Sequence, residues 1–142
     1  MAKSIQWTAT VQVGGQTELS LSRVTAVEAV DSVDVEILGT ADTDGPDADR
    51  EVEIQPSSLA GQVTFLAISA DNYGDDTHFL SYKVNGTGNP SFRLDQPLIL
   101  VGGGAVSALN DAPASLFVTS SLSQNATLRV LVGRDATPPP GP

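Results

Sequence analysis

The sequence predicts an all-β protein, an antiparallel β-sandwich that is jelly-roll-like and has about 8–10 short strands. Three observations lead to this fold class. Apolar and polar residues alternate in most of the apolar runs, which is the period of a strand and not of a helix. Turn signals such as Gly-Gly, Asp-Gly-Pro, Asn-Gly and Asn-Pro separate these runs at intervals of roughly 8–15 residues. Finally, 142 residues are a usual size for one domain with one core.

The N-terminal strands are predicted from strict alternation. Between residues 5 and 13 every odd position is apolar and every even position is Gln or Thr, and a Gly-Gly turn follows at 14–15. A second strand-like run covers residues 17–27. We expect these strands to be half-buried, with the apolar side chains inside and the polar ones outside. The stretch 22–32 comes nearest to a helical pattern, but its β-branched residues argue against a helix.

The later strands follow the same pattern, with one exception. Residues 63–70 (VTFLAISA) are apolar on both faces, which indicates a central strand covered on each side. The other strands are predicted at residues 33–37, 52–54, 78–84, 91–94, 97–101, 116–119 and 126–132. The run Gly102–Gly104 lies between two of these strands and lacks the Gly-Lys-Ser/Thr of a phosphate-binding loop. We therefore interpret it as a flexible turn.

These strands predict a single β-sandwich domain over residues 1–136, followed by a Pro-rich C-terminal tail at 137–142. The tail reads Thr-Pro-Pro-Pro-Gly-Pro. Because proline has no backbone N–H to donate, this segment is not expected to join a sheet and is typical of a polyproline-like conformation.

The composition argues against several classes of function. The chain has 17 acidic and 7 basic residues, a net charge of −10, whereas nucleic-acid binding needs clustered Lys and Arg. It has no cysteine and one histidine, which excludes disulfides, thiol catalysis and His-rich metal clusters. No apolar run approaches the ~20 residues that cross a bilayer, and no signal-peptide pattern follows Met1. We expect synthesis in a host cytoplasm without a signal peptide, no nucleic-acid partner and no membrane.

The acidic segment is the clearest candidate site. Ten acidic residues and one basic residue lie between positions 28 and 53. The centre of this segment holds Asp42, Asp44, Asp47 and Asp49 around a Gly-Pro turn. Closely spaced carboxylates on such a turn suit Ca²⁺, although the spacing is not that of an EF-hand. These four aspartates are the candidate calcium ligands. The alternative is a solvated hairpin tip whose charges discourage edge-to-edge strand pairing.

A second acidic loop at residues 71–76 precedes His78, and it raises the question of catalysis. An Asp/His/Ser arrangement with Ser69 or Ser81 would make a small hydrolase, but the sequence has no G-x-S-x-G elbow. We therefore assign no catalytic residue and do not expect an enzyme. A glycan-binding module is a further alternative, although aromatic residues, which stack on sugars, make up only 5% of the chain.

The segment from Phe79 to Asp135 has a distinctive order of motifs. It reads FLSYKVNG, then FRLDQPLILVGGG, then APASLFVTSSLSQNATLRVLVGRD. This segment resembles small β-sandwich structural proteins of tailed-phage and prophage virions, of decoration or fibre type. In these proteins a Lys-x-Asn-Gly turn precedes a "pl-l-l" strand, and an S-L-(F/Y)-V-(T/S) strand pairs with a final x-V-x-(V/I)-L-x-G strand. The resemblance implies a structural role in a viral particle. It does not extend to residues 2–56.

We therefore predict a non-enzymatic structural protein of the virion, a capsid decoration or cement protein that binds the lattice as a homo-oligomer. A trimer is favoured, because jelly rolls suit clustering around a local threefold axis. The expected partners are further copies of the chain and the major capsid or other virion proteins. The strand at 5–13 and the Pro-rich tail are the segments expected to reach a neighbour. Two alternatives stay open: a tail or head-fibre component, and a Ca²⁺-dependent glycan-binding β-sandwich.

Overall fold

The computed structural model describes residues 3–54 and 62–135, which form ten strands and one helix. The predicted Pro-rich tail lies outside the described residues. In chain order the elements are β1 (Lys3–Val13), β2 (Gln16–Val27), β3 (Ala29–Ile37), β4 (Arg50–Glu53), β5 (Val63–Ala70), β6 (Leu80–Val84), β7 (Ser91–Leu94), β8 (Leu98–Val101), α1 (Gly103–Leu109), β9 (Ser115–Ser120) and β10 (Ala126–Arg134). Every strand pair is antiparallel, so the predicted all-β class is confirmed.

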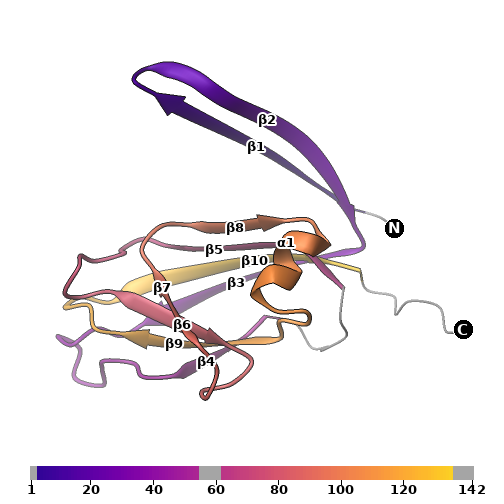
Figure 1. Ribbon diagram of the computed structural model, residues 1–142. Coiled ribbons are helices and arrows are strands. Elements are labelled where there is room, and N and C mark those ends of the chain that lie inside the picture. Colours follow the sequence, from indigo (N-terminus) through magenta and orange to yellow (C-terminus); the bar gives the residue numbers. More distant parts are fainter. Residues whose placement is uncertain (1–2, 55–61, 136–142) are drawn as a thin grey trace, which may run out of the picture.

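Strands β3 to β10 form a two-layer sandwich (Figure 1). One sheet has the order β3-β10-β5-β8 and the other has the order β4-β9-β6-β7. Among these eight strands, only β6 and β7 are consecutive in the chain and neighbours in one sheet; every other connection crosses to the opposite sheet. This interleaved order is that of a jelly roll. The predicted jelly-roll-like sandwich is therefore confirmed.

The main core lies between the two sheets and is built from aliphatic side chains. Alternation in β10 shows how the sequence creates it: Leu128, Val130 and Val132 are buried, whereas Thr127 and Arg129 are exposed on the outer face. The central strand β5 coincides with the predicted 63–70, and its two-sided apolar pattern is confirmed. Leu66 and Ile68 belong to the core, and Phe65, on the opposite face of the strand, is buried as well.

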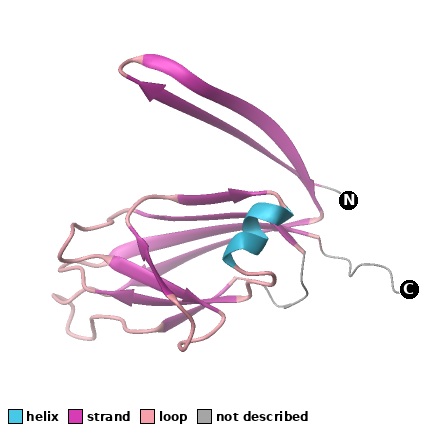
Figure 2. Cartoon of the chain, viewed as in Figure 1, coloured by secondary structure: helices cyan, strands magenta, loops and turns pink. Residues whose placement is uncertain are grey.

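The segment after β8 differs from the expectation. Instead of a flexible turn, the triple glycine leads into α1, a helix that begins at Gly103 (Figure 2). Val106 is its buried residue, and it belongs to the main core. The sequence did not predict this helix because glycine is an unfavourable helix residue. The helix forms because the following Ala-Val-Ser-Ala-Leu can pack one side onto the sandwich.

Strands β1 and β2 form a hairpin that belongs to neither sheet, and we call residues 3–27 the arm. Its strands pair from Lys3↔Val27 to the turn at Gly14-Gly15, with a bulge between Val11 and Gln12. Figure 1 shows the arm leaving one end of the sandwich and standing above the β3-β10-β5-β8 sheet, on the side away from the other sheet. The molecule therefore has a third, two-stranded layer that is only partly in contact with the body.

The two faces of the arm are chemically different. Directly paired residues of an antiparallel ladder share a face, so the register assigns each side chain. One face is apolar apart from Lys3 and Arg23 towards its base and a few uncharged polar residues, and it carries Ile5, Trp7, Ala9, Val11, Val13, Leu19 and Leu21. The other face is polar, and its paired residues are uncharged: it carries Gln6, Thr8, Thr10, Ser20 and Ser22, with Val24 as its one large apolar residue. Glu18 lies at the bulge, outside the paired register.

The expectation that the arm is half-buried is wrong for its outer part. Ile5, Trp7 and Ala9 are partly buried, whereas Val11 and Leu19, further from the body, are exposed. Alternation of period two shows that these side chains share a face, but it does not supply a layer to cover that face. Among the described residues, 3–54 and 62–135, the arm is covered near its base and not towards its tip.

The base of the arm is held by a small apolar cluster outside the main core. Val27 and Phe65 are almost completely buried, yet neither belongs to the main core. A Cβ placed on Gly133 of β10 would lie 2.6 Å from Ile5 Cδ1, 3.0 Å from Val27 Cγ1 and 3.1 Å from Phe65 Cβ. The absence of a side chain at Gly133 thus lets the arm approach the outer face of the sheet.

Candidate functional site

The jelly-roll connections give the molecule two structurally different ends. The arm is attached beside the start of β3 and the end of β10, where Ala29 pairs with Arg134. At the opposite end β3, β5 and β7 stop, and their following loops gather there, joined by hydrogen bonds from Thr40 N to Leu122 O and from Ser121 N to Phe79 O. We call these loops (38–49, 71–79, 95–97 and 121–125) the acidic end.

The acidic end contains eight of the seventeen acidic residues: Asp42, Asp44, Asp47, Asp49, Asp71, Asp75, Asp76 and Asp95. Sequence inspection found two acidic loops but did not place them together, because their meeting depends on the order of strands in the sheets. The arm, in contrast, holds one acidic residue, Glu18, and two basic ones, Lys3 and Arg23. Charge and apolar surface are therefore concentrated in different parts of the molecule.

The four aspartates predicted to bind calcium do not converge on a common point. Asp42 accepts hydrogen bonds from Asn125 Nδ2 (3.0 Å) and from the backbone N–H of Asp44 (2.9 Å), and these bonds hold its pKa below the ordinary value. Asp47 accepts from Leu38 N at 2.8 Å and pairs with Arg50 at 3.2 Å.

The last of the four, Asp49, pairs instead with Lys83 at 3.1 Å. Within residues 3–54 and 62–135, no group of three or more Asp, Glu, His or Cys side chains is arranged to hold a metal ion. The geometry thus gives the predicted calcium site no support. The physical reason is local: these carboxylates cap turns and neutralise neighbouring cations, so they point in different directions.

The loop before His78 is organised around Asp75. Its Oδ1 accepts hydrogen bonds from Thr77 N, Thr77 Oγ1 and His78 N, each at 2.9 Å. Chiefly because of the backbone bonds, the pKa of Asp75 falls from 3.8 to about 2. His78 Nδ1 lies 2.9 Å from Thr77 Oγ1, and no hydrogen bond joins the ring to Ser69 or Ser81 in the described residues. The hydroxyl beside the imidazole is that of Thr77, which also donates to Asp75, so the arrangement is that of a structural turn and not the predicted grouping with Ser69 or Ser81.

We predict a measurable pH signature for this turn. Since the pKa of Asp75 is lower in the folded protein, its contribution to stability is full above about pH 4 and is lost as the pH falls towards 2. Asp75→Asn should lower the thermal midpoint at pH 7, and the difference from the wild type should shrink between pH 4 and pH 2. Asp95→Asn, which removes a charge from the same end, is the control. A difference that stays constant down to pH 2 would contradict the assignment.

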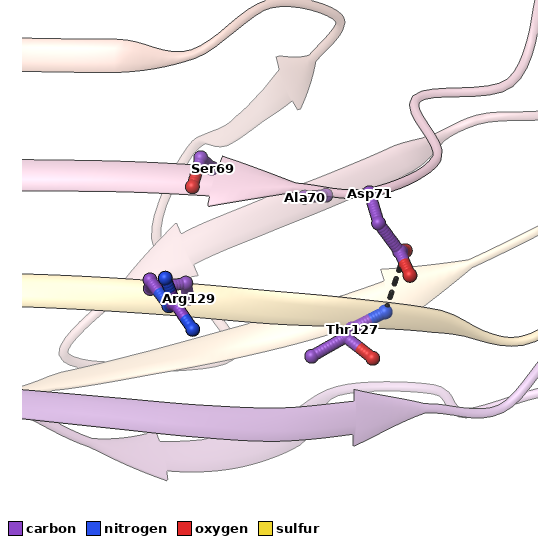
Figure 3. A pocket seen from close by; sticks show the side chains of 5 residues that line it. All are labelled: Ser69, Ala70, Asp71, Thr127 and Arg129. Atoms are coloured by element: carbon purple, nitrogen blue, oxygen red, sulfur yellow. Dashed lines mark hydrogen bonds between the residues drawn. The ribbon is translucent and has the colours of Figure 1, made fainter.

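An open depression lies on the outer face of the β3-β10-β5-β8 sheet, near the acidic end (Figure 3). Its volume is about 450 Å³, and it is lined by Ser69, Ala70, Asp71, Thr127 and Arg129. The charged groups here are already engaged. Asp71 Oδ1 accepts from Thr127 N at 2.8 Å, and Arg129 forms a two-pronged pair with Asp34 at 2.8 and 3.1 Å. These interactions brace neighbouring strands and leave a shallow polar surface.

The strongest candidate for a functional surface is therefore the apolar face of the arm. Of the seven large apolar residues that are exposed in the described chain, five belong to the arm: Val11, Val13, Leu19, Leu21 and Val24. The first four share one face, and their exposure is greatest towards the tip. A continuous apolar face on a projecting element is typical of a protein–protein contact.

Comparisons with known proteins do not assign the chain to a family. No protein-family model, curated protein or solved structure matches it. The described part of the chain has no helix that is both long and apolar enough to cross a membrane.

Proposed function

We propose that the protein is a non-enzymatic structural protein of a viral particle, a decoration protein that binds the capsid lattice as a homo-oligomer. The observation that carries this proposal is the arm, a β-hairpin whose apolar outer part is exposed among the residues that the structure describes. An isolated two-stranded ribbon is marginally stable in water. Such an element gains its stability from a neighbour, which is what an assembly protein provides.

Two further points support this proposal. The body is a jelly roll, and jelly rolls occur among viral capsid domains, although they also occur in lectins, so the fold by itself is an analogy. Residues 79–135 resemble virion decoration and fibre proteins in their order of strand and turn motifs. The competing glycan-binding function depends on calcium held at Asp42–Asp49, which the directions of those carboxylates do not favour.

The acidic end is the part of the molecule proposed to meet the lattice. Its eight carboxylates include Asp44 and Asp95, which have no ion pair in the described structure, so a net negative potential extends from this end. A basic patch on a capsid protein would complement it. Contacts of this kind at a solvated rim weaken as salt rises, because the Debye length falls below about 10 Å above 0.1 M.

Co-sedimentation with capsids assembled without the protein tests the proposed function. The purified chain should pellet with these capsids up to a fixed ratio, and less of it should pellet as sodium chloride rises from about 0.05 to about 0.5 M. Asp44→Lys at the acidic end should reduce binding, whereas Glu18→Lys on the arm, with the same change in charge, should reduce it less. Binding to purified tails and not to capsids would identify a tail component. Binding to neither would overturn the proposal.

A further inference from the structure

We propose that the apolar face of the arm is covered by the same face of a second copy of this chain. This contact deepens the proposed function, since it names the surface through which the copies would join. The argument rests on where apolar surface and charge lie in the described residues. It also rests on how much area an arm can bury.

In the part of the chain that the structure describes, one apolar surface matches the arm in size, and that surface is a second arm. Outside the arm, the large apolar residues that are exposed in the described structure are Phe92 and Ile99. These two lie in different sheets, on β7 and β8, and do not form a face comparable to the arm. A second arm, by contrast, presents the same row of Val11, Val13, Leu19 and Leu21. Two identical patches in contact form an isologous interface, which closes as a dimer. This proposal therefore replaces the trimer favoured from the sequence.

Charge favours contact through the arms over contact through the bodies. Residues 3–27 hold two basic residues and one acidic residue, whereas the remainder holds sixteen of the seventeen acidic residues and five of the seven basic ones. Two bodies pressed together would therefore repel each other. The arm, with strands of up to 12 residues at about 3.3 Å each, spans roughly 40 Å. This length is several Debye lengths at physiological salt, so the arms can meet while the acidic ends stay apart.

The direction of the apolar face determines the route by which a second arm can reach it. Ile5 belongs to this face and approaches Gly133 on the outer side of the sheet, so the face is turned towards its own body. Figure 1 shows the arm and body diverging from this base towards the tip. A second arm can reach the exposed part only by entering between arm and body. Each arm would then lie between the arm and the body of the other copy, an arrangement that we call the clasp. The polar face of the entering arm would face the sheet that carries Ser69, Thr127 and Arg129.

This arrangement also reaches the area that a stable dimer requires. The outer half of the arm, about 18 Å long and 10 Å wide, offers roughly 180 Å² on each face. Face-to-face contact of two outer halves alone would bury about 360 Å² in total, below the ~1,000 Å² expected of a specific interface. When each arm also covers part of the partner's sheet, the total rises to about 1,100 Å² at most, just above that value.

Two exposed valines provide a matched test of the proposal. Val13 is on the apolar face and is 63% exposed, and Val24 is on the polar face and is 65% exposed. Val13→Lys places a charge in the proposed apolar contact, whereas Val24→Lys places the same charge on a face that would meet polar groups and an acidic partner. Multi-angle light scattering at about 100 µM should give a dimer for the wild type and for Val24→Lys. It should give a monomer for Val13→Lys, with the thermal midpoint of the sandwich unchanged.

Cross-linking tests the same contact independently of charge. Because the chain has no cysteine, Leu19→Cys introduces a single thiol at the centre of the apolar patch, and Val24→Cys introduces one on the opposite face. Oxidation should join two chains through Leu19→Cys and not through Val24→Cys. A monomeric or trimeric wild type, or equal behaviour of the two lysine variants, would overturn the clasp. A dimer that fails to pellet with capsids or tails would overturn the proposed function and leave the clasp intact.

Discussion

Gly133→Ala is expected to destabilise the protein by about 1–3 kcal/mol and to loosen the base of the arm. The added Cβ would lie 2.6 Å from Ile5 Cδ1, which is closer than real carbon atoms approach. Val27 and Phe65 are also within 3.1 Å of it and are almost completely buried, so the neighbours cannot simply turn aside. The least costly response is for the arm to move away from the sheet.

A second substitution makes this expectation specific. Ile5→Val removes the Cδ1 atom that the new Cβ would meet, and by itself it should cost about 0.5–1.5 kcal/mol. In the Gly133→Ala background it should instead restore part of the lost stability, so the two effects should not add. Urea denaturation gives the free energies, and amide hydrogen exchange in residues 3–13 reports the arm. Strict additivity, or unchanged exchange in the arm of Gly133→Ala, would show that Gly133 does not position the arm.

Gly74→Ala should produce the largest loss at the acidic end, about 2–4 kcal/mol. Gly74 has a φ of +74°, a conformation that L side chains rarely adopt. An added Cβ would also collide with the carbonyl oxygen of His78 and would lie 2.5 Å from Leu122 Cδ2. That carbonyl already accepts the backbone N–H of Asp75 at 2.8 Å. Neither the backbone nor the buried Leu122 can move without breaking the loop.

The control is a glycine that has neither a positive φ nor a close neighbour. Gly104 lies in α1, and a Cβ there would meet no atom within 4 Å. Because alanine is the better helix former, Gly104→Ala should be neutral or stabilising by up to about 1 kcal/mol. Thermal unfolding of the two variants, monitored by circular dichroism, compares them directly. Equal midpoints would mean that the contacts around Gly74 are not a constraint on the fold.

The strands were predictable because alternation is a local property of the sequence. Residues 63–70 are apolar at nearly every position, and they form the central strand β5 with the same boundaries. The helix α1 was missed because its first residues, Gly103 and Gly104, are those that most oppose a helix. Its formation depends on Val106 packing into the core, which is a tertiary effect.

The arm shows that sequence periodicity predicts a strand but does not predict its burial. The alternation of residues 5–13 correctly predicts a strand, but burial depends on a second layer that only the three-dimensional arrangement reveals. One signal was present in the sequence. In β3 and β4 the outward positions include Asp34, Glu36 and Glu51, whereas the outward positions of β1 are uncharged Gln and Thr. Apart from Lys3 at its start, β1 has two uncharged faces, which suit contacts on both sides.

Only part of the candidate site could be predicted from the sequence, for a similar reason. The acidic loops at 42–49 and 71–76 are evident in the sequence, but their joint position at one end follows from the jelly-roll connections. The directions of Asp47 and Asp49 are set by Arg50 and Lys83, and Lys83 is distant in the sequence. Proximity in the chain therefore does not show whether carboxylates point towards one another.

The arm is attached at the end opposite the acidic loops, and its tip stands away from the sandwich (Figure 1), so the tip and the acidic loops lie on different sides of the molecule and give it a polarity that can be read by microscopy. Asp95 and Gln96 form an exposed turn at the acidic end, and Gly14 and Gly15 form the tip of the arm. An electron-dense or fluorescent label inserted at one turn or the other would lie at a different height above a particle. Comparing the two heights would report how each subunit stands on the surface, whichever protein of the particle it binds.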